Sequence, residues 1–214
     1  MTPQHIEAKP GSGRIGIVHL GLGAFHRAHQ AVYLERYRQR SGDVDWGVCS
    51  ANLRSSIGLV DGLAAAGYRY HVAEYADSQH FVLREIGVIE EALFTGRDSA
   101  GNWGRDREAL LARMASADTR IVTLTVTEKG YFLNPASGDL KSDDPMIAGD
   151  IASPRQPRTA PGLLVEALAR RHEASIAPFT VLSCDNMPDN GKRTRQAVVQ
   201  LAEHRDPAAL LAAT

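Results

Sequence analysis

The sequence has little cysteine, few aromatic residues and almost no net charge. Of its 214 residues, 2 are cysteines and 6% are aromatic, and the formal net charge at pH 7 is -1. Cys49 and Cys184 lie in separate apolar, strand-like runs, so we expect two reduced, buried thiols in a cytoplasmic protein rather than a disulfide framework. Because basic residues neither exceed acidic ones nor cluster, the charge pattern argues against nucleic acid as a partner.

Long hydrophobic runs are also missing. No apolar run approaches the about 18 residues that a membrane-spanning helix needs, and the polar N-terminal segment lacks the apolar core of a signal peptide. We therefore expect no membrane partner. A hydrophobic share of 43% is ordinary for a globular protein, and 214 residues suffice for one large domain or one and a half ordinary ones.

Strand-like and helix-like segments alternate along the chain. Apolar and β-branched runs predict strands at residues 14–20, 46–51, 120–127 and 178–184. Apolar residues at helical spacing predict helices at residues 24–40, 56–66, 106–114, 161–172 and 192–203. Segments 69–75 and 81–88 are typical of an antiparallel pair, and residues 134–157, rich in Pro, Asp, Ser and Gly, of a long loop.

This alternation predicts an α/β fold with a doubly wound, mostly parallel sheet and an antiparallel excursion. We expect residues 14–205 to form this domain. Residues 1–13 are expected to be a flexible tail, and residues 206–214 the start of a linker.

Four loops at one edge of this sheet contain the unusual polar motifs. Ligands of such sheets bind outside the carboxyl ends of the strands, near the point where the strand order reverses. The loops that this rule selects follow Leu20, Ala51, Thr127 and Cys184. The coincidence of motifs and strand ends is stronger evidence for a ligand site than any one motif.

The first loop, Gly21-Leu22-Gly23-Ala24-Phe25, links a strand to a helix. Two glycines let the backbone turn tightly and approach a pyrophosphate, which the N–H groups and the dipole of the helix start favour. Arg27 adds a fork of donors for phosphate. The alternative is a tight turn without a ligand.

His26 and His29 have the i, i+3 spacing of metal ligands, but no third ligand is evident, so we expect no metal.

The second loop, residues 52–56, lacks the acid that an NAD-preferring site places here for the ribose 2′-hydroxyl. No acid appears before Asp61. Arg54 and the two serines beside it suit a 2′-phosphate instead. Arg54 is equally well explained as a solvated loop residue.

The third and fourth loops hold candidates for acid–base chemistry and for oxygen binding. Glu128 and Lys129 form either an acid/base pair or a surface ion pair that contributes little. The fourth loop has two Asp and two Asn within six residues, from Asp185 to Asn190, which exceeds the need of one helix cap. An amide there would donate to a substrate oxygen or to a nicotinamide carboxamide.

Together the motifs resemble the polyol-specific long-chain dehydrogenases. The matching stretches are G-x-G-x-F-H-R-A-H, D-W-G-x-C, T-x-T-E-K-G-Y and S-C-D-N-x-x-x-N-G, in that order. The family includes mannitol 2-dehydrogenase and mannonate oxidoreductase, also called fructuronate reductase. The resemblance implies a Rossmann-type domain for NAD or NADP, and oxidation of a secondary alcohol of a sugar alcohol or aldonate to a ketone without metal.

The resemblance also implies roles for particular residues. Asn186 matches the amide that helps form the oxyanion hole around the carbonyl oxygen of the substrate, and Glu128 matches the acid that assists proton movement. The expected cofactor contacts are Gly21, Gly23, Ala24, Phe25, Arg27, Asn52, Arg54 and Thr127.

Two departures from the family pattern carry weight. NAD-preferring relatives have an acid just after L-R-S, where this chain has Ser56 and Ile57; we expect NAD, and NADP is not excluded. The lysine that serves the family as general base lies in a K-x-x-x-x-N-x-x-H helix of a C-terminal domain, and this sequence lacks that pattern. We expect the cofactor domain of a longer enzyme, its partners being that missing domain and a small polyol or sugar acid. The alternative is a stand-alone nucleotide-binding module without catalysis.

Overall fold

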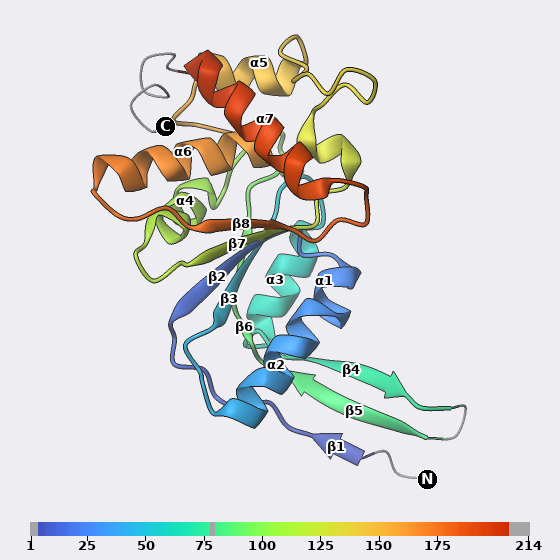
Figure 1. The fold of residues 1–214 in the computed structure, drawn as a ribbon. Coiled ribbons are helices and arrows are strands. Elements are labelled where there is room, and N and C mark those ends of the chain that lie inside the picture. The colour runs from blue at the N-terminus through green and yellow to red at the C-terminus, as the bar shows by residue number, and fades with distance from the viewer. Residues whose placement is uncertain (1–3, 78–79, 206–214) are drawn as a thin grey trace.

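Five parallel strands form the main sheet of the protein (Figure 1). The computed structural model describes residues 4–77 and 80–205. The strand order is β6-β3-β2-β7-β8, and every neighbouring pair is parallel. The strands of this sheet are β2 (Ile15–Leu20), β3 (Gly47–Asn52), β6 (Ile89–Phe94), β7 (Ile121–Leu124) and β8 (Thr180–Ser183).

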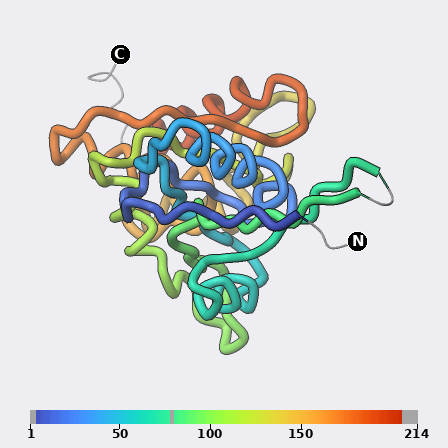
Figure 2. Tube along the Cα trace, turned by 90° about the horizontal axis from the view of Figure 1, so that it is seen from below, coloured from blue at the N-terminus to red at the C-terminus, as the bar shows by residue number. Residues whose placement is uncertain are grey.

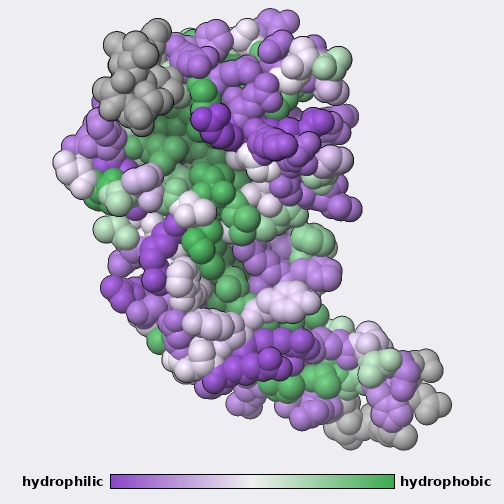
Figure 3. Space-filling view, in the orientation of Figure 1, coloured by the Kyte–Doolittle hydropathy of each residue, from purple (hydrophilic) through white to green (hydrophobic). Residues whose placement is uncertain are grey.

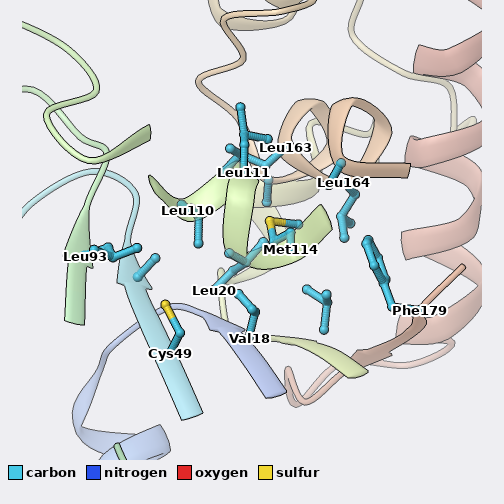
Figure 4. Close-up of a cluster of buried hydrophobic side chains, with 14 of the residues drawn as sticks. Val18, Leu20, Cys49, Leu93, Leu110, Leu111, Met114, Leu163, Leu164 and Phe179 are labelled. Atoms are coloured by element: carbon cyan, nitrogen blue, oxygen red, sulfur yellow. The ribbon is translucent and has the colours of Figure 1, made fainter. Parts of the chain in front are cut away.

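Helices cover both faces of the sheet. They are α1 (Ala24–Ala28), α2 (Gln30–Ser41), α3 (Ile57–Ala65), α4 (Arg107–Ala115), α6 (Ala160–Glu173) and α7 (Asn190–Arg205). Ile17 of β2 packs in the cluster that α2 and α3 complete on one face. Its neighbour Val18 packs in the cluster that α4 and α6 complete on the other face (Figure 4). Because β2 is covered on both faces, it is apolar at consecutive positions rather than at alternate ones. The predicted doubly wound, mostly parallel α/β fold is confirmed.

The strand order reverses at β2. The chain proceeds from β2 to β3 and β6 on one side, then crosses to β7 and β8 on the other. The loops that leave β2 and β7 therefore run in opposite directions and leave a crevice between them, where α/β sheets bind ligands.

A smaller three-stranded sheet of order β1-β5-β4 projects from the body (Figures 1 and 2). β4 (Tyr70–Tyr75) and β5 (Phe81–Ile86) are antiparallel, as predicted. The expected flexible tail is wrong for residues 4–6, because they form β1 (Gln4–Ile6), parallel to β5. Residues 1–3 and the expected linker 206–214 lie outside the described residues.

The segment after β1 is held by buried charges. The N–H of Lys9 donates to the Glu35 carboxylate over 3.2 Å, and the N–H of Gly13 donates to Glu90 over 3.0 Å. Arg38, only 1% exposed, pairs with Glu90 at 2.5 Å. These contacts join residues far apart in sequence, so local composition gives no sign of them.

Three further elements differ from the prediction. The helix expected at 24–40 breaks into α1 and α2 at His29, whose backbone, with φ of -120° and ψ of -78°, is not helical. The strand expected at 81–88 ends at Ile86, and β6 follows as a separate parallel strand. The loop expected at 134–157 contains α5 (Pro145–Ala152), whose first turn the Asp144 carboxylate caps.

The sheet edge at β8 is less covered than its centre. Leu182 of β8 is 51% exposed, and Figure 3 shows hydrophobic surface along the middle of the face in view, between hydrophilic surfaces on either side.

Across residues 4–77 and 80–205, no helix has the length and apolar character needed to cross a membrane.

Candidate functional site

The loops after β2, β3 and β7 line one open cleft of about 150 Å³ at the carboxyl edge of the sheet. Gly21 stands at its base, at the end of β2. The other lining residues come from the second loop, the third loop, α5 and the start of α6: Asn52, Leu53, Arg54, Ser55, Thr125, Val126, Gly130, Phe132, Met146, Arg158, Thr159 and Ala160. The sequence-based choice of this sheet edge thus coincides with the position of the cleft.

The fold requires glycine at one of the two glycine positions of the first loop and not at the other. Gly21 has φ of +121°, and a Cβ there would lie 2.2 Å from the carbonyl oxygen of Thr125. Only glycine fits this position. Gly23 has an extended backbone, and a Cβ there would meet nothing nearer than the Gly21 carbonyl oxygen at 3.9 Å. The fold therefore does not need glycine at position 23, and the exposed space beside it is free for a ligand.

The third and fourth loops are joined by Asp185. Its carboxylate accepts hydrogen bonds from the N–H groups of Val126 at 3.1 Å and Thr127 at 3.0 Å, and from the Tyr131 hydroxyl at 2.6 Å. Thr127 has φ of +65°, a conformation that costs energy for a β-branched residue. Asn190 holds the fourth loop from the other side, because its Nδ2 donates to the Asp185 carbonyl at 2.9 Å. Burial and the neighbouring Asp185 raise the pKa of Tyr131.

The expected cofactor residues fall into two groups. Gly21, Asn52 and Arg54 line the cleft. Outside the lining, Gly23, Ala24 and Thr127 are exposed, as is Phe25 with 55% of its surface. Arg27 is half-buried, and its Nε is buried without a hydrogen-bond partner.

The two expected catalytic residues also lie outside the cleft lining. Glu128 is exposed in the short 3-10 helix Glu128–Tyr131 and pairs with Arg193 of α7 at 3.4 Å, rather than with Lys129. The Asn186 side chain is exposed in the fourth loop.

The cleft is lined by two cations. Arg54 lies over the ring of Phe132, 5.7 Å from its centroid, and Arg158 lies 5.6 Å from the ring centroid of Trp103. No carboxylate occurs among the lining residues of the described chain. An anionic ligand therefore meets no like charge in the lining.

The two histidines of the first loop have separate surroundings. His26 is fully buried, and its ring nitrogens lie 2.8 Å from Gln30 and 2.8 Å from Ser50. His29 is exposed and packs near Phe25, with ring centroids 4.8 Å apart. The described residues contain no group of three or more potential metal ligands.

Sequence reasoning missed several residues that shape the site. Asp185, Tyr131 and Thr125 act through contacts between loops, and Arg158 reaches the cleft from the segment between the expected loop 134–157 and the expected helix 161–172. His19 lies within an apolar strand and gave no signal except its polarity in an otherwise buried run.

A doubly wound sheet with a glycine turn at its switch point defines a Rossmann-type nucleotide-binding domain. A family model described as the mannitol dehydrogenase Rossmann domain matches residues 15–213. The chain therefore belongs to the mannitol dehydrogenase family, as the motifs of the sequence indicated.

Individual relatives agree with this assignment. The chain is 43% identical over 192 residues to the uncharacterized oxidoreductase YeiQ of Escherichia coli, covering 89% of this chain and 37% of that protein. It is 44% identical over 193 residues to D-mannonate oxidoreductase of Escherichia coli, covering 89% of this chain and 38% of that enzyme. The chain thus spans less than two fifths of the length of these relatives.

A solved structure matches the fold closely. Mannitol 2-dehydrogenase of Pseudomonas fluorescens, in a ternary complex with NAD and D-mannitol, superposes with a TM-score of 0.85 at 35% identity. The match covers 97% of this chain and 41% of that one.

Proposed function

We propose that this chain is the nicotinamide-dinucleotide-binding domain of a metal-independent sugar-alcohol or aldonate dehydrogenase. In that reaction hydride moves between a secondary alcohol and NAD(P), and the bound nicotinamide ring supplies the hydride acceptor. The observation that carries the proposal is the cleft at the strand-order reversal, with Gly21 at its base and cations but no carboxylate in its lining. The NAD complex of the Pseudomonas fluorescens relative supports it.

The residues of the first two loops fit a dinucleotide. The exposed Gly23 offers room for close approach of a pyrophosphate, beside Ala24 and Phe25. Arg27, whose buried Nε has no partner, adds positive charge behind this loop. Asn52 and Arg54 stand at the end of β3, where a Rossmann-type domain meets the adenosine ribose.

The fourth loop supplies a candidate hydrogen-bond donor for an oxyanion hole, the side-chain amide of Asn186. The Asn186 amide is exposed and free to donate to the oxygen of a bound alcohol or ketone, which stabilises negative charge on that oxygen during hydride transfer. Glu128 and Thr127 stand on the third loop, and we assign to Glu128 the assistance in proton movement that the family resemblance implies. The general-base lysine of the family pattern has no counterpart in this sequence, so we expect this chain alone to have little or no activity.

Titration of the chain with NADH and NADPH, followed by nicotinamide fluorescence, tests the proposal. We expect saturable binding of at least one of them. A chain that is folded by circular dichroism but binds neither nucleotide would contradict the proposed function.

Two matched variants make this test specific to the glycine loop. Gly23→Val adds a side chain where the protein has open space, so we expect unchanged thermal stability and loss of at least tenfold in NADH affinity. Gly62→Val adds the same side chain to open space on α3, away from the cleft lining, and should leave NADH affinity unchanged. Equal affinity of wild type and Gly23→Val would exclude this loop as the pyrophosphate site.

A further inference from the structure

A buried polar cluster lies directly beneath the first loop, and the proposed function does not use it. His19 of β2 and His26 of α1 are both 0% exposed. Their rings are stacked, with centroids 3.6 Å apart and planes 7° apart. Buried polar groups of this kind persist only when their hydrogen bonds are satisfied.

The proton positions on His19 follow from its partners. Nε2 lies 3.0 Å from the carbonyl oxygen of Gly21, which can only accept, and 2.9 Å from the Thr125 hydroxyl, which gives its own proton to the same carbonyl, so Nε2 carries the proton. Nδ1 of the neutral ring is then an acceptor. It lies 2.6 Å from the Thr123 hydroxyl, which therefore donates to it.

The proton positions on His26 follow in the same way. Nδ1 lies 2.8 Å from Oε1 of Gln30, again an acceptor, so Nδ1 carries the proton. Nε2 accepts from the Ser50 hydroxyl at 2.8 Å. The Gln30 amide nitrogen donates to the Thr123 hydroxyl oxygen at 3.2 Å, which joins the two halves. One directed chain of hydrogen bonds thus runs from Ser50 on β3 to the Gly21 carbonyl.

The end of this chain controls the backbone of the loop. The Gly21 carbonyl also accepts from the Thr125 hydroxyl at 3.0 Å and from the N–H of Gly23 at 2.6 Å. Glycine permits many orientations of this peptide plane, and these donors select one. Because the peptide bond is planar and trans, its C=O and N–H point in opposite directions. A carbonyl held towards His19 therefore turns the Leu22 N–H to the opposite side, away from the buried cluster.

We propose that His19 and His26 are positioning residues that hold the Gly21 carbonyl and thereby orient the glycine loop for the pyrophosphate of the dinucleotide. They act through the loop backbone and touch no substrate. This inference rests on the proposed function, because it assigns these residues a role in the binding of the same cofactor.

Substitutions at His19 separate positioning from simple stability. His19→Leu removes the donor to Gly21, and we expect the dissociation constant for NADH to rise about tenfold or more. His19→Gln restores an N–H donor at a similar distance, and we expect an affinity within about threefold of wild type. All titrations are made at a temperature where circular dichroism shows each variant fully folded, so that loss of folded protein does not enter the measurement.

Two other variants serve as control and as reserve. Thr119→Val removes a buried hydroxyl that donates to the Arg113 carbonyl at the opposite edge of the sheet; it should lower stability without changing NADH affinity. If His19→Leu does not fold, Ser50→Ala tests the far end of the chain, with an expected loss of about threefold. Wild-type protein that fails to bind would overturn the proposed function. Wild-type protein that binds, with folded His19→Leu or Ser50→Ala binding equally well, would overturn the positioning role alone.

Discussion

The Tyr131 hydroxyl donates a hydrogen bond of 2.6 Å to the Asp185 carboxylate, and this contact ties the loop after β7 to the loop after β8. The same hydroxyl lies 2.7 Å from the Ser183 hydroxyl. Two loops that are 54 residues apart in the chain are thereby fixed as one wall beside the cleft. The strained backbone at Thr127 persists because its N–H is bound to this carboxylate.

Tyr131→Phe should lower the free energy of unfolding by about 2 kcal/mol, because it removes a hydrogen bond to a charged acceptor in a buried position. Urea unfolding measures the change. Tyr75→Phe is the matched control, since Tyr75 is 69% exposed, and its stability should equal that of wild type. A Tyr131→Phe protein as stable as the control would show that Asp185 does not need the hydroxyl.

Gly21→Ala should destabilise the protein by about 3 kcal/mol or more. A Cβ would lie 2.2 Å from the Thr125 carbonyl oxygen, and φ of +121° is unfavourable for alanine. Gly42 also has a positive φ, but no atom lies within 4 Å of a Cβ added there. Gly42→Ala is therefore expected to destabilise the protein by about 1 kcal/mol. Similar losses for both, measured by thermal or urea unfolding, would mean that the contact with Thr125 relaxes at little cost.

Stability should fall as the pH drops from about 6.5 towards 4. Burial lowers the pKa of His26 to about 4, from an ordinary value near 6.5, so between these values only the unfolded chain takes up the proton. Burial also lowers the pKa of His19, which adds in the same direction. Among the groups that face His26, Arg27 on α1 is charged and opposes protonation, the ring of His19 on β2 is kept neutral by burial, and Ser50 and Gln30 carry no charge.

For His26 alone, the free energy of unfolding falls by about 3 kcal/mol as the pH drops from 6.5 to 4, and this loss is absent above pH 6.5. Urea unfolding at pH 7.5, 6.0 and 5.0 measures it. His26→Gln should be less stable at pH 7.5 but should lose less on acidification. Parallel pH profiles for the two proteins would show that His26 does not cause the acid sensitivity.

Arg54→Ala should weaken the binding of NADPH more than that of NADH. Arg54 is the only charged residue of the second loop, residues 52–56, and no carboxylate stands there to receive a ribose 2′-hydroxyl. We expect a differential loss of about tenfold, measured as the ratio of the two dissociation constants. An unchanged ratio would show that Arg54 does not contact the 2′-phosphate and that it packs only against its own loop and Phe132.

The sequence predicted those parts of the fold that depend on local pattern. The consecutive apolar residues of β2 and the β-branched run of β7 identified the buried strands, and Gly21 marked the turn between β2 and α1. The resulting α/β class and the family assignment are both confirmed. The roles of Asn186 and Glu128 stay predictions, because both residues lie outside the cleft lining.

Features that depend on contacts between distant segments were not predictable. β6 was missed because the predicted strand 81–88 ended just before it, and only Gly87 and Val88 separate β5 from β6, so no turn signal marked the start of a new strand. The hydrogen bonds that place Asp185 beside Thr127, or His19 beneath Gly21, connect side chains whose neighbours in sequence give no indication of them.

The burial of Glu35 and Arg38 has a practical consequence for where the gene can be cut. A version that begins at residue 14 looks harmless from the sequence, since the removed stretch is polar and has no helical or strand pattern. It would remove the Lys9 N–H from Glu35 and the Gly13 N–H from Glu90, and it would expose the side of α2 on which Arg38 is now enclosed. Such a shortened gene should yield less soluble protein than one that begins at Met1, and a purification tag is better joined before these residues than in place of them.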